Sequence, residues 1–129
     1  MKTILVVEDF SYARQFICNT LQKHGYHTVD ASSAQEAYQV LEYDSQINLV
    51  LSDFNVTNCG FDLLKTIKNN PAMENIPFVF LTTDFHTDKV RFAKESGIAS
   101  FIQKPFREGN FFAEIDRAMS IKGSIINIA

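Results

Sequence analysis

Short apolar runs alternate with longer amphipathic segments along almost the entire chain. The runs have the length of β-strands, the amphipathic segments repeat their apolar residues with the period of an α-helix, and five such pairs follow one another. This alternation is typical of βα units, in which successive strands lie parallel in one sheet. We therefore predict an α/β fold whose strands occupy residues 3–7, 27–31, 49–52, 78–81 and 100–102.

The polarity of the expected strands indicates their places in the sheet. A parallel strand that is covered by helices on both faces is apolar along nearly its whole length. The first, third and fourth runs have this character, whereas the runs at 27–31 and 100–102 contain more polar residues. We expect the second and fifth strands at the two edges of the sheet.

Local signals mark the ends of two expected helices. The first helix is expected to begin near Ser11, to turn Phe16 toward the core and to end before Gly25, because glycine readily adopts the positive φ of a helix C-terminus. Ser33 is followed three residues later by Glu36, which is the pattern of a capping box at the start of the second helix.

The length of the chain fits one domain. A chain of 129 residues can bury one sizeable core and is too short for two. The last amphipathic segment predicts a helix over about residues 108–121, and the apolar residues after it show no period. We therefore predict a domain over residues 1–122 and a C-terminal tail over residues 123–129.

Composition and charge argue against several classes of function. Lys and Arg number 12 against 15 Asp and Glu, and without a run of like charges this balance argues against direct binding of nucleic acid. The apolar runs are too short to span a membrane, and the N-terminus lacks the cleavage site of a signal peptide. Cys18 and Cys59 are expected as free thiols, so we expect a cytoplasmic protein.

Polar residues directly follow four of the five expected strands. Glu8 and Asp9 follow the first strand and Asp53 the third, while Thr82 follows the fourth and Lys104 lies just beyond the fifth. Each residue alone would be an ordinary loop or surface residue, but the carboxyl ends of parallel strands meet at one edge, where ligands bind in open α/β sheets. Carboxylates gathered there need a positive charge, and their oxygen ligands favour Mg²⁺. Their coincidence at one edge points to a functional site.

Four motifs carry a family resemblance. They are Ile-Leu-Val-Val-Glu-Asp at 4–9, Leu-Val-Leu-Ser-Asp-Phe-Asn at 49–55, Phe-Val-Phe-Leu-Thr-Thr at 78–83 and Phe-Ile-Gln-Lys-Pro-Phe at 101–106. Together they resemble the receiver domain of bacterial two-component response regulators, particularly the stand-alone chemotaxis-type regulators. The resemblance implies a doubly wound, flavodoxin-like parallel sheet of five strands in the order 2-1-3-4-5, with five helices.

The resemblance implies a phosphoacceptor in a phosphorelay, with self-catalysed phosphotransfer and autodephosphorylation only, and not an enzyme in the ordinary sense. Asp53 would accept a phosphoryl group from a histidine kinase or a histidine phosphotransfer protein. Mg²⁺ would be held by Glu8, Asp9, Asp53 and the backbone carbonyl of Asn55. Lys104 would pair with Asp53 or, after transfer, with a phosphoryl oxygen.

The resemblance also implies a switch. Thr82 would move to bond the phosphoryl group, Phe101 would rotate into the space that Thr82 leaves, and the Lys104–Pro105 peptide bond would be cis. The switch would change the face formed by the fourth helix, fifth strand and fifth helix, which binds an unknown protein target or a second copy in a weak, phosphorylation-dependent homodimer. The 12 phenylalanines mostly fit core faces, and the alternative is that some of them mark a partner surface, including Phe85, Phe92 and Phe111.

The chain departs from the family pattern in one loop. Thr57 stands where proline is usual, and Gly60 comes one residue early, so the loop at 56–60 is expected to be shortened and differently shaped. Asn55 and Asp84 would flank the path of water to the phosphoryl group, and both are small and polar. We therefore expect a short-lived phosphorylated state.

Three alternatives use the same residues differently. The altered loop leaves a receiver-like interaction module that works without phosphorylation as an alternative, and the intact site residues argue against it, namely Glu8, Asp9, Asp53, Thr82 and Lys104. The segment around Asp53 also resembles the first motif of haloacid-dehalogenase-type phosphatases, but Asn55 cannot serve as the general acid that this chemistry needs. A flavodoxin-like FMN binder would need backbone amides and hydroxyls for its phosphate where this chain has Glu8 and Asp9.

Overall fold

The architecture was obtained as a computed structural model, which describes residues 1–44, 46–55, 60–83 and 87–128. Strands and helices alternate along the chain as the sequence predicts. Their bounds are β1 (Thr3–Val7), α1 (Ser11–Lys23), β2 (His27–Ala31), α2 (Ala34–Tyr43), β3 (Leu49–Asp53), α3 (Gly60–Lys68), β4 (Phe78–Thr82), α4 (Thr87–Glu95), β5 (Ser100–Gln103) and α5 (Glu108–Ile128).

The strands form one parallel sheet in the order β2-β1-β3-β4-β5, which confirms the expected topology and both edge strands. Every residue of the central strands β3 and β4 is buried. Both strands end one residue later than expected, so Asp53 and Thr82 are the last residues of their strands. The two side chains are therefore held by the sheet itself.

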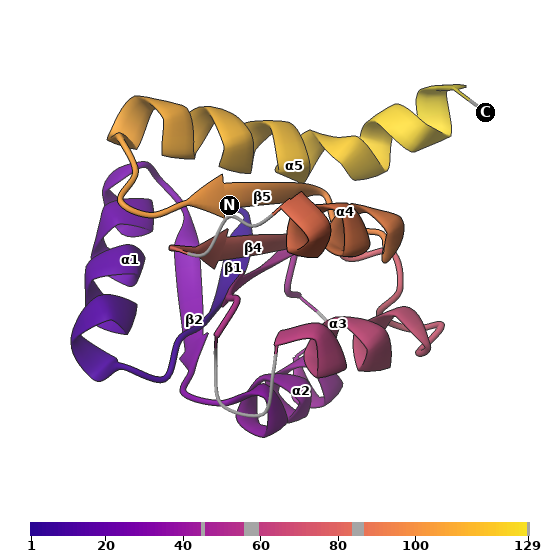
Figure 1. Ribbon diagram of the computed structural model, residues 1–129, viewed down its shortest axis with the longest axis horizontal. Coiled ribbons are helices and arrows are strands. Elements are labelled where there is room, and N and C mark those ends of the chain that lie inside the picture. Colours follow the sequence, from indigo (N-terminus) through magenta and orange to yellow (C-terminus); the bar gives the residue numbers. More distant parts are fainter. Residues whose placement is uncertain (45, 56–59, 84–86, 129) are drawn as a thin grey trace.

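Helices cover both faces of the sheet (Figure 1). Helices α1 and α5 pack on one face, where Ile17 of α1 and Phe111 of α5 belong to one core cluster together with residues of the strands. Helices α2, α3 and α4 pack on the other face, where Leu41 of α2 and Leu64 of α3 belong to a separate core cluster. Successive strand side chains point to opposite faces, so both cores are anchored by the same strands.

The inward face of α1 differs from the expected one. Phe16 is 56% exposed, so the prediction that it faces the core is wrong. The buried residues of this helix are Ile17, Cys18, Thr20 and Leu21. Adjacent residues of a helix point about 100° apart, and the sheet lies on the side of Ile17 and not of Phe16.

Two of the predicted helix ends take the expected form with one shift. Gly25 has φ of 99° and directly follows the C-terminus of α1. The Ser33 hydroxyl accepts a hydrogen bond from the amide of Glu36 at 3.1 Å and caps α2. The Glu36 carboxylate bonds the amide and hydroxyl of Ser32 instead of the Ser33 amide, so the capping box closes one residue early.

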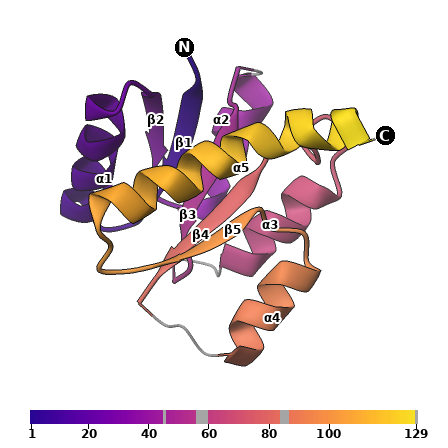
Figure 2. The ribbon, with the colours of Figure 1, turned by 90° about the horizontal axis from the view of Figure 1, so that it is seen from above.

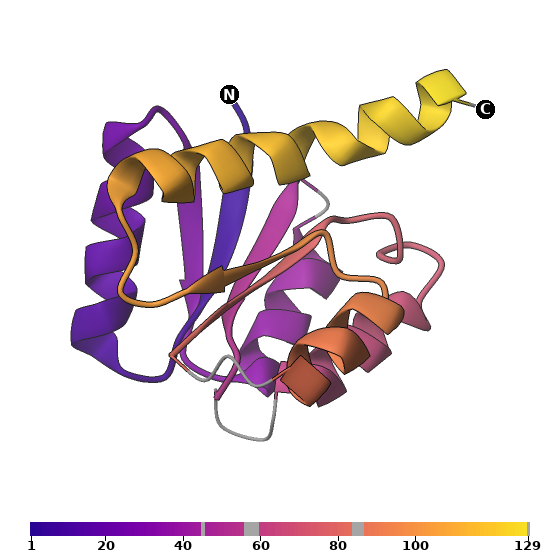
Figure 3. The same ribbon diagram turned by 45° about the horizontal axis from the view of Figure 1, so that its top comes forward.

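Helix α5 is longer than expected. It continues to Ile128 instead of ending near Ile121, and Figures 2 and 3 show its C-terminal turns extending past the sheet. A glycine such as Gly123 lowers helix stability by about 1 kcal/mol relative to alanine but does not by itself end a helix. The division into a domain over 1–122 and a tail over 123–129 stays a prediction.

Two predictions about surfaces have different outcomes. Phe111 is fully buried in the core, which confirms a core position and makes the alternative of a partner surface wrong for this residue. Phe92 is 56% exposed on α4. Phe85 lies outside the described residues, as do Cys59, Asp84 and the loop at 56–59.

Over the part of the chain that is described, no helix has the length and apolar character needed to cross a membrane.

Candidate functional site

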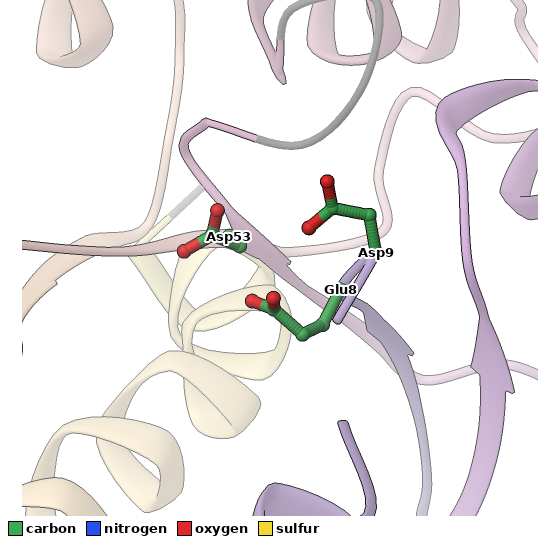
Figure 4. Close-up of side chains that lie close together, drawn as sticks. All are labelled: Glu8, Asp9 and Asp53. Carbon is green, nitrogen blue, oxygen red and sulfur yellow. The ribbon is translucent and has the colours of Figure 1, made fainter. Parts of the chain in front are cut away.

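The sheet brings the predicted site residues together at its carboxyl edge. Glu8 and Asp9 directly follow β1, and Asp53 ends β3. Figure 4 shows the three side chains pointing toward one another, and each offers a carboxylate oxygen within 4.8 Å of the others. Glu8 and Asp53 are buried, whereas Asp9 is exposed. The cluster is therefore open to solvent on the side of Asp9.

Lys104 reaches this cluster from beyond β5. Its ammonium nitrogen donates to Oδ1 of Asp53 at 2.7 Å and lies 3.8 Å from Oε2 of Glu8. The Lys104 amide donates to the carbonyl of Thr82 at 2.7 Å, and the following peptide bond to Pro105 is cis, as expected. These contacts fix the backbone from which the lysine extends.

Both carboxylate oxygens of Asp53 are engaged. Oδ1 accepts from Lys104, and Oδ2 accepts from the backbone amide of Asn55 at 3.0 Å. The Asp53 residue is only 8% exposed. A charge-assisted bond on one oxygen and an amide bond on the other fix the plane of the carboxylate.

Glu8 is a buried carboxylate with only one of its two oxygens hydrogen-bonded within the described part of the chain. Its Oε1 accepts from the amide of Phe10 at 3.2 Å, while its buried Oε2 has no hydrogen-bond partner among the described residues. Burial, and next the charge of Asp53, raise the pKa of Glu8 above its ordinary value. A buried carboxylate oxygen without a donor is an acceptor that a cation would satisfy.

The cluster fits a hard divalent cation on chemical grounds. Its ligands are carboxylate oxygens from Glu8, Asp9 and Asp53, and the described part of the chain offers no histidine or cysteine to this cluster. Mg²⁺ prefers oxygen ligands and commonly takes one or two carboxylates while keeping several waters. The exposed Asp9 side leaves room for such waters.

The two predicted switch residues lie on the neighbouring strands β4 and β5. Thr82 is completely buried at the end of β4. Phe101 is partly buried on β5, and its ring centroid lies 5.8 Å from that of Phe54 and 5.9 Å from that of Phe80. The strand pairing places Phe80 opposite Phe101. Phe54, which directly follows Asp53, thus links the acidic cluster to this aromatic group.

Arg14 is a site residue that the sequence analysis did not single out. It lies in α1 and donates to the backbone carbonyl of Glu8 at 2.8 Å. An arginine in an exposed helical stretch is ordinary, and a bond to a main-chain carbonyl leaves no pattern in side-chain types. The one feature of the sequence that could have pointed to Arg14 is Asp30 on β2, an acidic residue with which Arg14 forms an ion pair.

The sheet order and the acidic edge define a receiver-type α/β domain. The chain matches the model of the response regulator receiver domain over residues 4–116. The chain therefore belongs to the response regulator receiver domain family. Receiver domains in general are non-enzymatic phosphoacceptors that bind Mg²⁺ and interact with a histidine kinase and with downstream targets.

Two of the similar proteins are chemotaxis regulators. The chain is 32% identical to chemotaxis protein CheY1 of Helicobacter pylori over 105 residues, which cover 80% of this chain and 85% of that protein. It resembles the structure of chemotaxis response regulator CheY4 of Vibrio cholerae with a TM-score of 0.84 and 26% identity, over 92% of this chain and 98% of that one. A receiver domain protein from Clostridium thermocellum, 24% identical, shares the fold with a TM-score of 0.89 over 97% of this chain and 99% of that one.

Proposed function

We propose that this chain accepts a phosphoryl group on Asp53 from a histidine kinase or a histidine phosphotransfer protein in the cytoplasm. The observation that carries the proposal is the ion pair of 2.7 Å between Lys104 and Asp53, formed beside the carboxylates of Glu8 and Asp9. A carboxylate that is buried, oriented and faced by a lysine at the open edge of the sheet is a suitable nucleophile for phosphoryl transfer.

The transfer exchanges one bond to phosphorus for another. A carboxylate oxygen of Asp53 forms a bond to the phosphorus atom of a phosphohistidine, the bond between phosphorus and the donor nitrogen breaks, and the released imidazole takes up a proton. The product is an acyl phosphate on Asp53. Lys104, freed from Asp53 by this step, is placed to pair with a phosphoryl oxygen.

Glu8, Asp9, Asp53 and the backbone carbonyl of Asn55 are the residues that we propose to hold Mg²⁺. The unsatisfied Oε2 of Glu8 and the all-oxygen donor set support this assignment. When bound, Mg²⁺ supplies positive charge against the phosphoryl oxygens, which the carboxylates would otherwise repel. The backbone amide of Asn55 holds Asp53 from the other side.

The output of the domain is proposed to lie on the face formed by α4, β5 and α5. Thr82 and Phe101 occupy neighbouring strands between the acidic cluster and this face, which suits a switch from one to the other. A groove of about 560 Å³ runs along the face and is lined by residues of all three elements, among them Lys94, Phe101 and Glu114. We propose that a downstream protein binds here, with the domain a monomer or a weak phosphorylation-dependent homodimer.

The test is to label the protein with a small phosphodonor and Mg²⁺ and to locate the added phosphate by mass spectrometry. We expect one phosphate on Asp53, and we expect Asp53→Asn or an excess of EDTA to abolish the labelling. Asp62, an exposed aspartate in the first turn of α3, supplies a matched control, since Asp62→Asn should label like wild type. Full labelling of Asp53→Asn would refute the assignment. Absence of labelling in wild type would favour an interaction module that works without phosphorylation.

A further inference from the structure

The guanidinium of Arg14 joins the start of α1 to two neighbouring segments. Its Nη1 donates to the backbone carbonyl of Glu8 at 2.8 Å, and its Nε donates to Oδ2 of Asp30 on β2 at 3.0 Å. The Arg14 side chain is 19% exposed, against 55% for Asp30. Two bonds from one planar group fix its orientation, which a point-like ammonium cannot do.

Other bonds also hold the turn between β1 and α1, among them the bond from the amide of Phe10 to Oε1 of Glu8 at 3.2 Å. The N-cap residue of α1, Phe10, makes no side-chain capping bond, and the first turn contains no acidic residue. The amide of Glu8 donates to the carbonyl of Ala31 at 3.1 Å, so the Glu8 residue is bonded through its amide to β2 and through its carbonyl to Arg14. Arg14 is therefore the side chain that ties the main chain of Glu8 to both α1 and β2.

The charge of Arg14 is directed away from the acidic cluster. The guanidinium bonds a neutral carbonyl of Glu8, and its ionic partner is Asp30 on the neighbouring strand. An arginine that bonds the carbonyl of Glu8 and lost Asp30 as its partner would be drawn to the carboxylates of Glu8 and Asp9 and would compete with a divalent cation. Asp30 thus keeps the arginine in a structural position.

We propose that Arg14, held by Asp30, is a positioning residue that sets the arrangement of Glu8 and Asp9 and thereby the affinity for the divalent cation. The inference rests on the proposed function, because it concerns the same metal site. Residues that orient metal ligands without touching the metal typically change metal affinity by about 10- to 100-fold when they are replaced.

The test is titration calorimetry of Mg²⁺ into wild type, Arg14→Gln, Arg14→Lys and Asp30→Asn. We expect each variant to bind Mg²⁺ about tenfold more weakly, as for other residues that orient metal ligands. Lysine should not rescue, because it can bond the carbonyl of Glu8 or the carboxylate of Asp30 but cannot hold both in one plane. Asp30→Asn replaces an exposed side chain that is not a proposed ligand, so a loss of affinity there is difficult to attribute to misfolding.

Arg117 supplies the matched control. It also donates to a backbone carbonyl, that of Ala99 at 2.9 Å, and to a carboxylate, that of Glu114 at 3.0 Å, but it lies on α5 and bonds no residue of the acidic turn. Arg117→Gln should bind Mg²⁺ like wild type. Equal affinities in wild type, Arg14→Gln and Asp30→Asn would overturn the positioning role while leaving the proposed function intact, as would an equal loss in Arg117→Gln. Failure of wild type to bind millimolar Mg²⁺ would overturn both.

Discussion

Replacement of Lys104 by methionine should destabilise the metal-free protein and make its stability depend on Mg²⁺. The substitution keeps most of the aliphatic side chain and removes the ammonium. Asp53 and Glu8 then face each other, both buried, without the positive charge that lies 2.7 Å and 3.8 Å from their oxygens. The variant therefore isolates the electrostatic role of the lysine.

The size of the effect follows from the geometry. Unit charges 2.7 Å apart attract by about 6 kcal/mol at an effective dielectric constant of about 20. Lys104 is 26% exposed, so solvent screening and the lysine's own desolvation offset roughly half of this attraction, which leaves about 3 kcal/mol. That value lies at the low end of the roughly 3–5 kcal/mol expected when one partner of a buried ion pair is removed.

The assay is urea denaturation at pH 7, followed by circular dichroism, with EDTA and with Mg²⁺. The free energy of unfolding of Lys104→Met should be about 3 kcal/mol below wild type in EDTA and should recover in part with Mg²⁺. Lys23→Met is the control, since Lys23 pairs with Glu108 at 3.6 Å on the surface and should change stability by no more than about 0.5 kcal/mol. A loss below about 1 kcal/mol for Lys104→Met, or an equal loss in an Asp53→Asn background, would refute the reasoning.

Four further changes test other parts of the structure. Glu8→Gln should stabilise the metal-free protein at pH 7, because the raised pKa of Glu8 shows that its ionisation is unfavourable in the fold. The gain in stability, measured by thermal denaturation, should shrink as the pH falls toward 4.5, the ordinary pKa of a glutamate side chain. A gain that is independent of pH would contradict this cause. Ser33→Ala should lower the free energy of unfolding by about 1 kcal/mol, because it removes the cap of α2, and an unchanged urea midpoint would show the cap to be unimportant. Thr82→Ala should leave labelling of Asp53 intact but reduce the spectral change that follows phosphorylation; an undiminished change would remove Thr82 from the switch. Asn55→Met should slow loss of phosphate from Asp53 by about tenfold, or about 1.4 kcal/mol in barrier, by shielding the phosphoryl group from water, and an unchanged decay rate would assign control of water access elsewhere.

The central strands could be predicted from the sequence because they are buried on both faces. A strand such as Leu49–Asp53 must be apolar along its length, and that constraint is visible without any knowledge of its neighbours. The same constraint makes polar residues conspicuous at a strand end, which is why Asp53 and Thr82 could be selected. Their convergence then follows from parallel pairing, since carboxyl ends of parallel strands share one edge.

Details that depend on tertiary position could not be predicted in this way. Phe16 and Ile17 are adjacent and both apolar, so the side of α1 that faces the sheet is set by packing and not by composition. For Phe111 the sequence leaves both a core face and a partner surface open, and the choice between them likewise depends on where α5 lies. Arg14 bonds a main-chain carbonyl, which every residue offers, so its partner is invisible in the sequence.

The carboxylates at the edge of the sheet repel one another, and in the metal-free fold several contacts offset part of this repulsion. Lys104 faces Asp53 and Glu8, the amides of Asn55 and Phe10 donate to the same two carboxylates, and one buried oxygen of Glu8 still lacks a donor. A donor of the protein and an external cation compete for the same carboxylate oxygens, so the oxygen that lacks a donor is the one most available to a cation. The stability of the metal-free fold and the affinity for Mg²⁺ are therefore linked, because the buried Oε2 of Glu8 weakens the fold and is also an oxygen that would bind Mg²⁺. A variant such as Glu8→Gln should be more stable than wild type and should bind Mg²⁺ more weakly.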